Sequence, residues 1–168
     1  GLCPITESSL GDGIFPARAF CDHRGRIGIG SDSNILLDAA AELRTLEYSQ
    51  RLAQQARNVL AAGSDASTGR SLFEAALAGG WQILQDAAAA PTGLAAGASL
   101  DLVTLRGEHP ALSARERDEI LDSWIFAGGR ELIDCVWRAG ERVVSGGRHR
   151  DRDALIARYA AALRRLRA

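Results

Sequence analysis

The stretch from residue 26 to residue 33 constrains the fold of this chain more than any other. Apolar and small residues alternate along it, it ends in the polar run Ser31-Asp32-Ser33, and a long helical pattern follows. This order is typical of a buried parallel strand that places one carboxylate, Asp32, at the C-terminal edge of an α/β barrel, where barrel enzymes carry their chemistry. The same polar residues also favour turns and helix caps, so a purely structural role stays open.

Chain length limits how much of such a barrel can be present. The chain has 168 residues, whereas a complete eight-stranded barrel typically needs about 250. The sequence contains no methionine, and residues 1–5 have the pattern of the middle of a strand with nothing before it. We therefore expect a fragment of a larger protein.

Charge and hydropathy argue against two classes of partner. A net charge of −1 disfavours a general electrostatic nucleic-acid binder. No apolar run approaches the roughly 18 residues that a membrane span needs. The three cysteines are widely spaced and form no CxxC pair, which favours free thiols in a reducing compartment and predicts a cytoplasmic protein.

Hydrophobic periodicity predicts strands alternating with helices in the first half of the chain and a different texture after Pro91. In the first half we expect a strand over residues 1–5, a polar loop over 6–13, a short helix over 16–22 and a second strand over 26–31. Two long amphipathic helices follow, over residues 38–60 and 67–86. In the second half we expect a β run over residues 99–105, a charged helix over 114–121 and an apolar patch at 124–126. A hairpin over residues 133–145 and a final amphipathic helix over 151–168 complete the chain pattern.

The final helix has an apolar face and an arginine-rich polar face. The apolar face consists of Leu155, Ile156, Tyr159, Ala162, Leu163 and Leu166. A basic amphipathic helix can bind nucleic acid, a membrane or an acidic partner. Cations near a helix C-terminus also complement the helix dipole, and a solvated face is the commoner case.

Three separated segments resemble the amidohydrolase superfamily, and within it the N-formimino-L-glutamate deiminases. Cys3-Pro4-Ile5-Thr6-Glu7 with the following Leu10-Gly11-Asp12-Gly13 resembles the loop after barrel strand seven. Gly30-Ser31-Asp32-Ser33 resembles the strand-eight motif, and residues 42–52 resemble the helix that follows it. Residues 93–105 and the hairpin 136–147 are similar to strands of the family's small β-sandwich domain.

The resemblance implies an α/β fold: the C-terminal part of a TIM-barrel amidohydrolase, with its last two barrel strands and helices. It assigns residues 1–91 to the (β/α)8 barrel, 92–147 to a small β-sandwich portion with an inserted helix, and 148–168 to a C-terminal helix. It also implies a metal-dependent hydrolase that deaminates N-formimino-L-glutamate to N-formyl-L-glutamate and ammonia in histidine degradation, with that small molecule as substrate.

The resemblance places Asp32 at the position of the family's metal-binding and catalytic aspartate. The implied cofactor is zinc or another divalent metal, which lowers the pKa of a bound water, and a carboxylate beside it can take the proton. Thr6, Glu7, Asp12 and Ser33 are then candidates for substrate binding at the barrel mouth, although an ordinary turn would use the same residues.

The histidines depart from the family pattern. The family holds its metal with a His-x-His pair and a further histidine, whereas His23, His109 and His149 are isolated here and are expected at the surface. Because a catalytic zinc needs about three protein ligands, we expect this chain to be inactive alone. Its expected partner is the missing N-terminal part of the same enzyme, or further copies in a homo-oligomer.

Two other functions stay open on the sequence. A deiminase of purines or related heterocycles would share the loop after strand seven, but that branch usually has Ser-Asn where this chain has Thr6-Glu7. A non-catalytic helical interaction module of barrel ancestry belongs to a different class. Upstream sequence would separate these functions. Arginines that bind a dicarboxylate would favour deamination of N-formimino-L-glutamate, whereas an aromatic pocket would favour a heterocycle deiminase.

Overall fold

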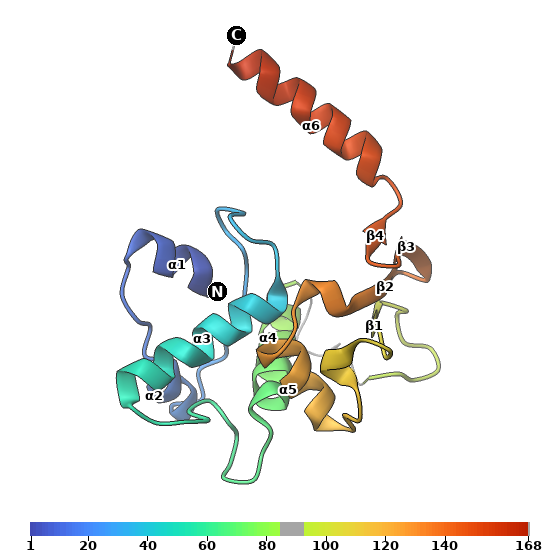
Figure 1. Cartoon of the computed structure of the whole chain (residues 1–168). Coiled ribbons are helices and arrows are strands. Elements are labelled where there is room, and N and C mark those ends of the chain that lie inside the picture. The colour runs from blue at the N-terminus through green and yellow to red at the C-terminus, as the bar shows by residue number, and fades with distance from the viewer. Residues whose placement is uncertain (85–92, 168) are drawn as a thin grey trace. The chain divides into compact units, whose positions relative to one another are not determined.

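The computed structural model describes residues 1–84 and 93–167, and their contacts divide into two units (Figure 1). The first unit comprises residues 1–98 and 107–130, and the second comprises residues 99–106 and 131–168, apart from the positions not described. The first unit contains helices α1 (Pro4–Leu10), α2 (Ala17–Asp22), α3 (Ala39–Gln54), α4 (Thr68–Leu84) and α5 (Asp118–Phe126). The second contains strands β1 (Leu102–Leu105), β2 (Ile133–Arg138), β3 (Glu141–Ser145) and β4 (Arg148–His149), and helix α6 (Arg152–Leu166).

Helix α3 is the centre of the first unit, since α1, α2 and α5 all contact it and α4 packs on α5. It begins where the sequence predicts, because the Asp38 carboxylate accepts hydrogen bonds from the Ala40 and Ala41 amides at 3.0 and 3.2 Å. Such a cap satisfies amides that have no partner within the helix. The largest apolar side chains that are fully buried in this core are Leu43, Leu46, Leu72 and Ile125.

Parallel pairing between the two predicted strands is confirmed only around Leu2. The Leu2 amide donates to the Gly28 carbonyl, the Gly30 amide donates to the Leu2 carbonyl, both at 2.9 Å, and Leu2 bridges Ile29 in parallel. The prediction of a strand to residue 5 and a loop from residue 6 was wrong, because α1 begins at Pro4. Proline favours the first turn of a helix, and Gly11 ends α1 in the left-handed conformation, with φ 77°.

Two other helix boundaries also differ from the prediction. Helix α3 ends at Gln54 rather than near residue 60, with Gln55 left-handed at φ 51°. Helix α5 begins four residues later than expected and includes the apolar patch 124–126, because Ala114 and Arg117 have φ of 55° and 51°. The predicted end of α4 at residue 86 lies outside the described residues.

Helix α4 approaches the segment 26–30 backbone to backbone. Gly79 is buried, and a Cβ added to it would overlap the Ile27 carbonyl oxygen and lie 3.1 Å from the Gly28 amide nitrogen. Glycine is needed here because any side chain would push the helix away from this segment.

Glu47 fixes the chain that leaves α3. Its side chain is fully buried, and its carboxylate accepts hydrogen bonds from the Val59 and Leu60 amides at 3.0 and 2.9 Å. It also pairs with the Arg51 guanidinium at 2.7 Å. The carboxylate therefore satisfies two amides of a segment that forms no helix of its own.

The second unit is built on a four-stranded antiparallel sheet in the order β1-β2-β3-β4. The predicted hairpin is confirmed, with Gly140 at φ 82° in its turn. The Asp101 carboxylate accepts a hydrogen bond from the Ala139 amide at 2.8 Å and so ties this turn to the segment before β1. The fold is thus mixed α/β, while the predicted barrel and sandwich domains stay predictions, and their boundary at residues 91–92 lies outside the described residues.

Helix α6 agrees with the predicted final helix, and none of its residues is buried. Among the described residues, no helix combines the length and apolar character that crossing a membrane would require.

Replacing Gly79 by alanine should destabilise the first unit. The new methyl group would displace α4 from Ile27, and overpacking of this kind costs typically about 1–3 kcal/mol. Gly80→Ala is the matched control, because nothing lies within 4 Å of a Cβ there and alanine is the better helix former. Urea unfolding of both variants measures the difference, and a Gly79→Ala variant as stable as Gly80→Ala would contradict the close approach.

Replacing Glu47 by glutamine should also destabilise the chain. The neutral amide turns an NH2 group toward backbone donors and removes charge-assisted hydrogen bonds, each worth about 1.5–3 kcal/mol. Glu74→Gln is the control, since Glu74 is 61% exposed in its pair with Arg70 and such pairs contribute at most about 1 kcal/mol. Equal unfolding free energies for the two variants would rule out the buried role of Glu47.

Candidate functional site

The parallel pairing at Leu2 brings two chain segments to one edge. After Leu2 the chain continues into α1, and after Gly30 it continues into the turn 31–34. Because paired parallel segments end on the same side, the residues that follow both of them meet there. This edge carries Asp32 and is the candidate functional site.

Thr6 joins the two segments. Its hydroxyl lies 2.9 Å from the Ser33 hydroxyl and donates to the Ser31 carbonyl at 3.2 Å. The Ser31 hydroxyl donates in turn to the Asn34 side-chain oxygen at 3.0 Å. Thr6 is 3% exposed, so its hydrogen bonds hold the turn on both sides of Asp32.

Asp32 itself is exposed at the top of this turn. Its backbone is left-handed, with φ 42°, a conformation that aspartate tolerates better than most residues. No hydrogen bond to its carboxylate occurs among the residues that the structure describes. The carboxylate is therefore available to a ligand that approaches this edge.

Two glutamates occupy the N-terminus of α1. The Glu7 carboxylate accepts a hydrogen bond from the Cys3 amide at 2.7 Å, and the Glu42 carboxylate accepts one from the Ile5 amide at 2.9 Å. These are free amides of the first helical turn, where negative charge is favourable. Glu42 thereby connects α3 to the start of α1.

Glu42 and Cys3 are the titratable groups that this environment changes. Burial raises the pKa of Glu42, and the nearby Glu7 and Asp38 carboxylates raise it further, whereas the Ile5 amide opposes the shift. Burial also raises the pKa of the Cys3 thiol, as do the Asp32, Glu42 and Glu7 carboxylates. A thiol in such surroundings is a poor nucleophile, so Cys3 is suited to packing rather than to covalent chemistry.

One oxygen of Glu42 has no partner. Glu42 is 2% exposed, and its Oε1 atom is buried without a hydrogen bond in the part of the chain that is described. A buried acceptor without a donor is costly when charged. The unpaired oxygen agrees with burial as the largest cause of the raised pKa of Glu42.

The described residues do not by themselves fit a catalytic metal. No group of three or more histidine, cysteine, aspartate or glutamate residues among them is arranged to hold an ion. Each histidine ring instead contacts a nearby backbone group through its Nδ1 atom. His23 contacts the Ala19 carbonyl, His109 the Ala111 amide and His149 the Asp151 amide. Asp32 can supply one ligand of the roughly three that catalytic zinc requires.

The structure brings together part of the predicted substrate-binding set. Thr6 and Ser33 meet beside Asp32, and Glu7 lies on the same helix as Thr6. Asp12 is exposed beyond the other end of α1, after the Gly11 cap. Contact of these four residues with a substrate stays a prediction.

Sequence reasoning missed Cys3 and Glu42 as part of this edge. A signal for Glu42 exists in hindsight, because a carboxylate stands among Ala40, Ala41 and Leu43, which form the buried stripe of α3. A buried glutamate generally needs a specific partner, and here that partner is the start of α1.

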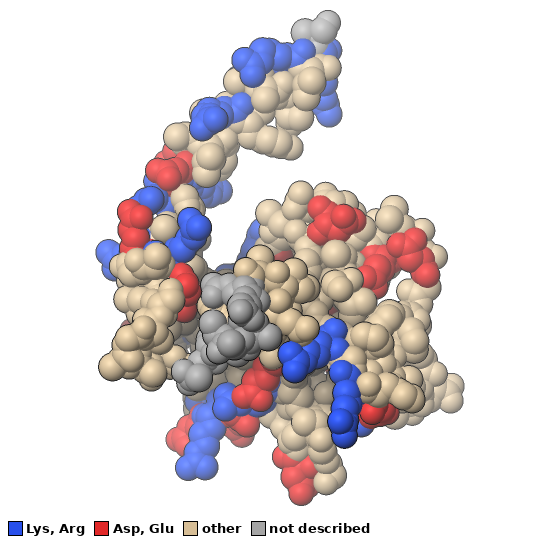
Figure 2. All heavy atoms as spheres, turned by 180° about the vertical axis from the view of Figure 1, so that it is seen from behind, with Lys and Arg blue, Asp and Glu red and all other residues tan. Residues whose placement is uncertain are grey.

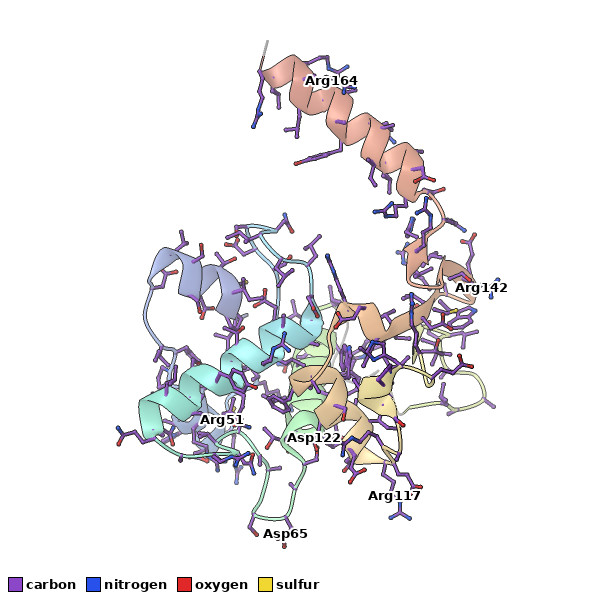
Figure 3. All side chains as sticks on the ribbon, viewed as in Figure 1. Arg51, Asp65, Arg117, Asp122, Arg142 and Arg164 are labelled. Carbon is purple, nitrogen blue, oxygen red and sulfur yellow. The ribbon has the colours of Figure 1, made fainter. Side chains whose placement is uncertain are left out.

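A second group of polar residues lies between α3, α4 and α5 (Figure 3). Arg51 projects from α3, and its guanidinium lies 5.3 Å from the centre of the Tyr48 ring and 5.2 Å from that of Phe126. The Asp122 carboxylate of α5 accepts a hydrogen bond from the Gly69 amide at 2.7 Å and so caps the start of α4. Both side chains are used to hold helices together, and neither belongs to the edge that carries Asp32.

Comparison with known proteins gives similarity over nearly the whole chain. No protein-family model matches it. A formimidoylglutamate deiminase from Pseudomonas aeruginosa is 49% identical over 150 residues, which are 89% of this chain and 32% of that protein. A crystal structure of an amidohydrolase from Brucella melitensis is 47% identical with a TM-score of 0.90, and the match covers 100% of this chain and 36% of that one.

A more distant structure shares the fold alone. An adenosine deaminase from Xanthomonas campestris, solved with bound zinc, is 23% identical with a TM-score of 0.78, over 98% of this chain and 36% of that one. This chain thus spans about a third of the length of each of these three proteins. The resemblance drawn from the sequence motifs is confirmed: over nearly its whole length, this chain is similar to part of a formimidoylglutamate deiminase and to part of an amidohydrolase.

Proposed function

We propose that this chain forms the C-terminal part of a metal-dependent hydrolase that converts N-formimino-L-glutamate to N-formyl-L-glutamate and ammonia. The observation that carries the proposal is the 49% identity to a formimidoylglutamate deiminase, combined with an exposed carboxylate, Asp32, at the edge where the paired segments end. In barrel enzymes the chemistry lies at this edge. The predicted assignment of residues 1–91 to a barrel and 92–147 to a small sandwich is part of the same proposal.

Asp32 would act as one metal ligand and as the residue that moves a proton. A divalent metal such as zinc, when bound, supplies Lewis-acid activation of water. The Asp32 carboxylate would accept the proton released when water attacks the formimino carbon, and would pass it to the nitrogen that leaves as ammonia. The Thr6 and Ser33 hydroxyls would keep the turn, and with it the carboxylate, in one position.

The substrate of this proposal, N-formimino-L-glutamate, is supported by the 49% identity to a formimidoylglutamate deiminase. The adenosine deaminase resembles this chain only in fold, so it gives no support to a heterocyclic substrate. The side chains of Thr6 and Glu7 form hydrogen bonds within the chain, Thr6 with Ser33 and Glu7 with the Cys3 amide, so they do not indicate a particular substrate. An alternative deiminase substrate is therefore not better supported than formiminoglutamate.

The chain alone should neither bind zinc stoichiometrically nor release ammonia from N-formimino-L-glutamate. The reason is that Asp32 is a single ligand, and the described residues offer no cluster of three. Metal analysis of the purified chain, beside an ammonia-release assay, measures both. A chain that carries about one zinc per molecule and turns over would overturn the view that other ligands are needed.

Asp32→Asn should abolish deamination in a protein that joins this chain to the remaining two thirds of the Pseudomonas relative. The amide cannot accept the proton and is a weaker metal ligand, and loss of a general base typically costs about 10²–10⁴-fold in rate. Asp65→Asn is the control, because Asp65 is exposed in the loop before α4 (Figure 3). The unfolding free energy should be nearly the same in both variants, and retained activity in Asp32→Asn would remove Asp32 from the mechanism.

A further inference from the structure

Helix α6 carries an apolar seam with the spacing of a coiled coil, and the residues that the structure describes leave this seam exposed. Along the helix, apolar residues recur at intervals of three, four and three residues, at Ile156, Tyr159, Leu163 and Leu166. Their side chains are exposed by 47%, 65%, 37% and 83%. This 3-4-3 spacing corresponds to alternating a and d positions of the heptad repeat, which pack against a second helix.

The residues beside the seam are small or charged, except for Leu155, which is a large apolar residue at a g position and is 49% exposed. With Ile156 and Leu163 at position a, Ala160 occupies an e position and Ala162 a g position. Small residues at these positions allow a second helix to approach closely. A shallow hollow of about 440 Å³, lined by Ala160, Leu163, Arg164 and Arg167, lies on this part of the helix.

Charge is distributed unevenly along α6. In Figure 2 the end of α6 nearest the C-terminus shows arginine atoms in blue, whereas both red acidic atoms and blue basic atoms appear near its start. The first turn carries Asp153 beside Arg152, whereas the last turn carries Arg164 and Arg165, followed by Arg167, with no acidic residue. Asp153 and Arg167 both fall at e positions of the heptad.

These two e positions distinguish the two orientations in which a second copy could dock. In an antiparallel pair the e positions face each other, so Asp153 would lie opposite Arg167 of the partner subunit, twice by symmetry. Ala160 would lie near its own counterpart at the centre. In a parallel pair the arginine-rich ends would lie side by side and repel each other.

We propose that α6 binds α6 of a second copy of this chain, in antiparallel orientation. The occupant is a second copy because the seam and its flanking charges are self-complementary about a point midway between Tyr159 and Leu163. The Arg148 guanidinium already contacts Asp153 at 2.5 Å, but a carboxylate accepts several hydrogen bonds, so it can also bind Arg167 of the partner subunit. Two heptads make a short seam, so a concentration-dependent equilibrium between monomer and dimer is expected.

Sedimentation equilibrium of the 168-residue chain over a range of concentrations tests the proposal. The wild-type chain should approach twice the monomer mass as concentration rises. Leu163→Asp places a charge in the seam and should weaken the association constant by roughly a hundredfold or more. Ala161→Asp introduces the same charge two residues away, at the f position opposite the seam, and should leave association unchanged.

Exchange of charges tests the orientation. Asp153→Arg or Arg167→Asp alone should weaken association by roughly fivefold, as expected for two exposed ion pairs. The double variant Asp153→Arg/Arg167→Asp should recover most of it, because the pairs re-form with their signs exchanged. Only an antiparallel pair predicts this recovery.

Three outcomes would overturn the proposal. The first is a chain that stays monomeric at every concentration while circular dichroism shows α6 folded, which would leave the seam to another partner. The second is a dimer that Leu163→Asp does not disturb, and the third is a double variant no better than the single ones. None of these outcomes depends on deiminase activity, so the proposed function is tested separately.

Discussion

Two main-chain hydrogen bonds around Leu2 determine where the residues of the candidate site lie. They join the Leu2 amide to the Gly28 carbonyl and the Gly30 amide to the Leu2 carbonyl. Without them, α1 and the turn that carries Asp32 would have no common edge. The pairing depends on packing from behind, where Gly79 lets α4 reach the Ile27 backbone. The lack of a side chain at Gly79 therefore helps to determine where the Asp32 carboxylate lies.

The edge combines several carboxylates in a small space, and the start of α1 is what makes this possible. Free amides at Cys3 and Ile5 bind Glu7 and Glu42, so part of the negative charge is neutralised locally. Burial still disfavours the charged carboxylate of Glu42. Its pKa is therefore raised, which means that folding favours its protonated form. Its contribution to stability is therefore full at pH values below the unfolded pKa, and is lost as the pH rises through the folded pKa. Asp32, by contrast, stays in contact with solvent at the top of its turn.

The parts of the fold that depend on local signals could be predicted from the sequence. The Asp38 cap marked the start of α3, and Gly140 marked the hairpin turn. The end of α3 could not be predicted, because it depends on Glu47 binding amides 12 and 13 residues further along the chain. Helix α1 was missed for a different reason: apolar residues at its start fit a strand equally well, and the signals of Pro4 and Gly11 were given too little weight.

Of the candidate site, the sequence could predict the place of Asp32 at an edge but not the residues that surround it. A strand pattern that ends in Ser31-Asp32-Ser33 is sufficient to indicate an exposed carboxylate at an edge. The Thr6 hydroxyl that holds this turn lies 25 residues before Ser31, and only the pairing at Leu2 makes them neighbours. The same holds for Glu42, which reaches Ile5 across 37 residues. Sequence motifs can thus indicate an exposed carboxylate at an edge, whereas the residues that position it become visible only once the backbone pairing is known.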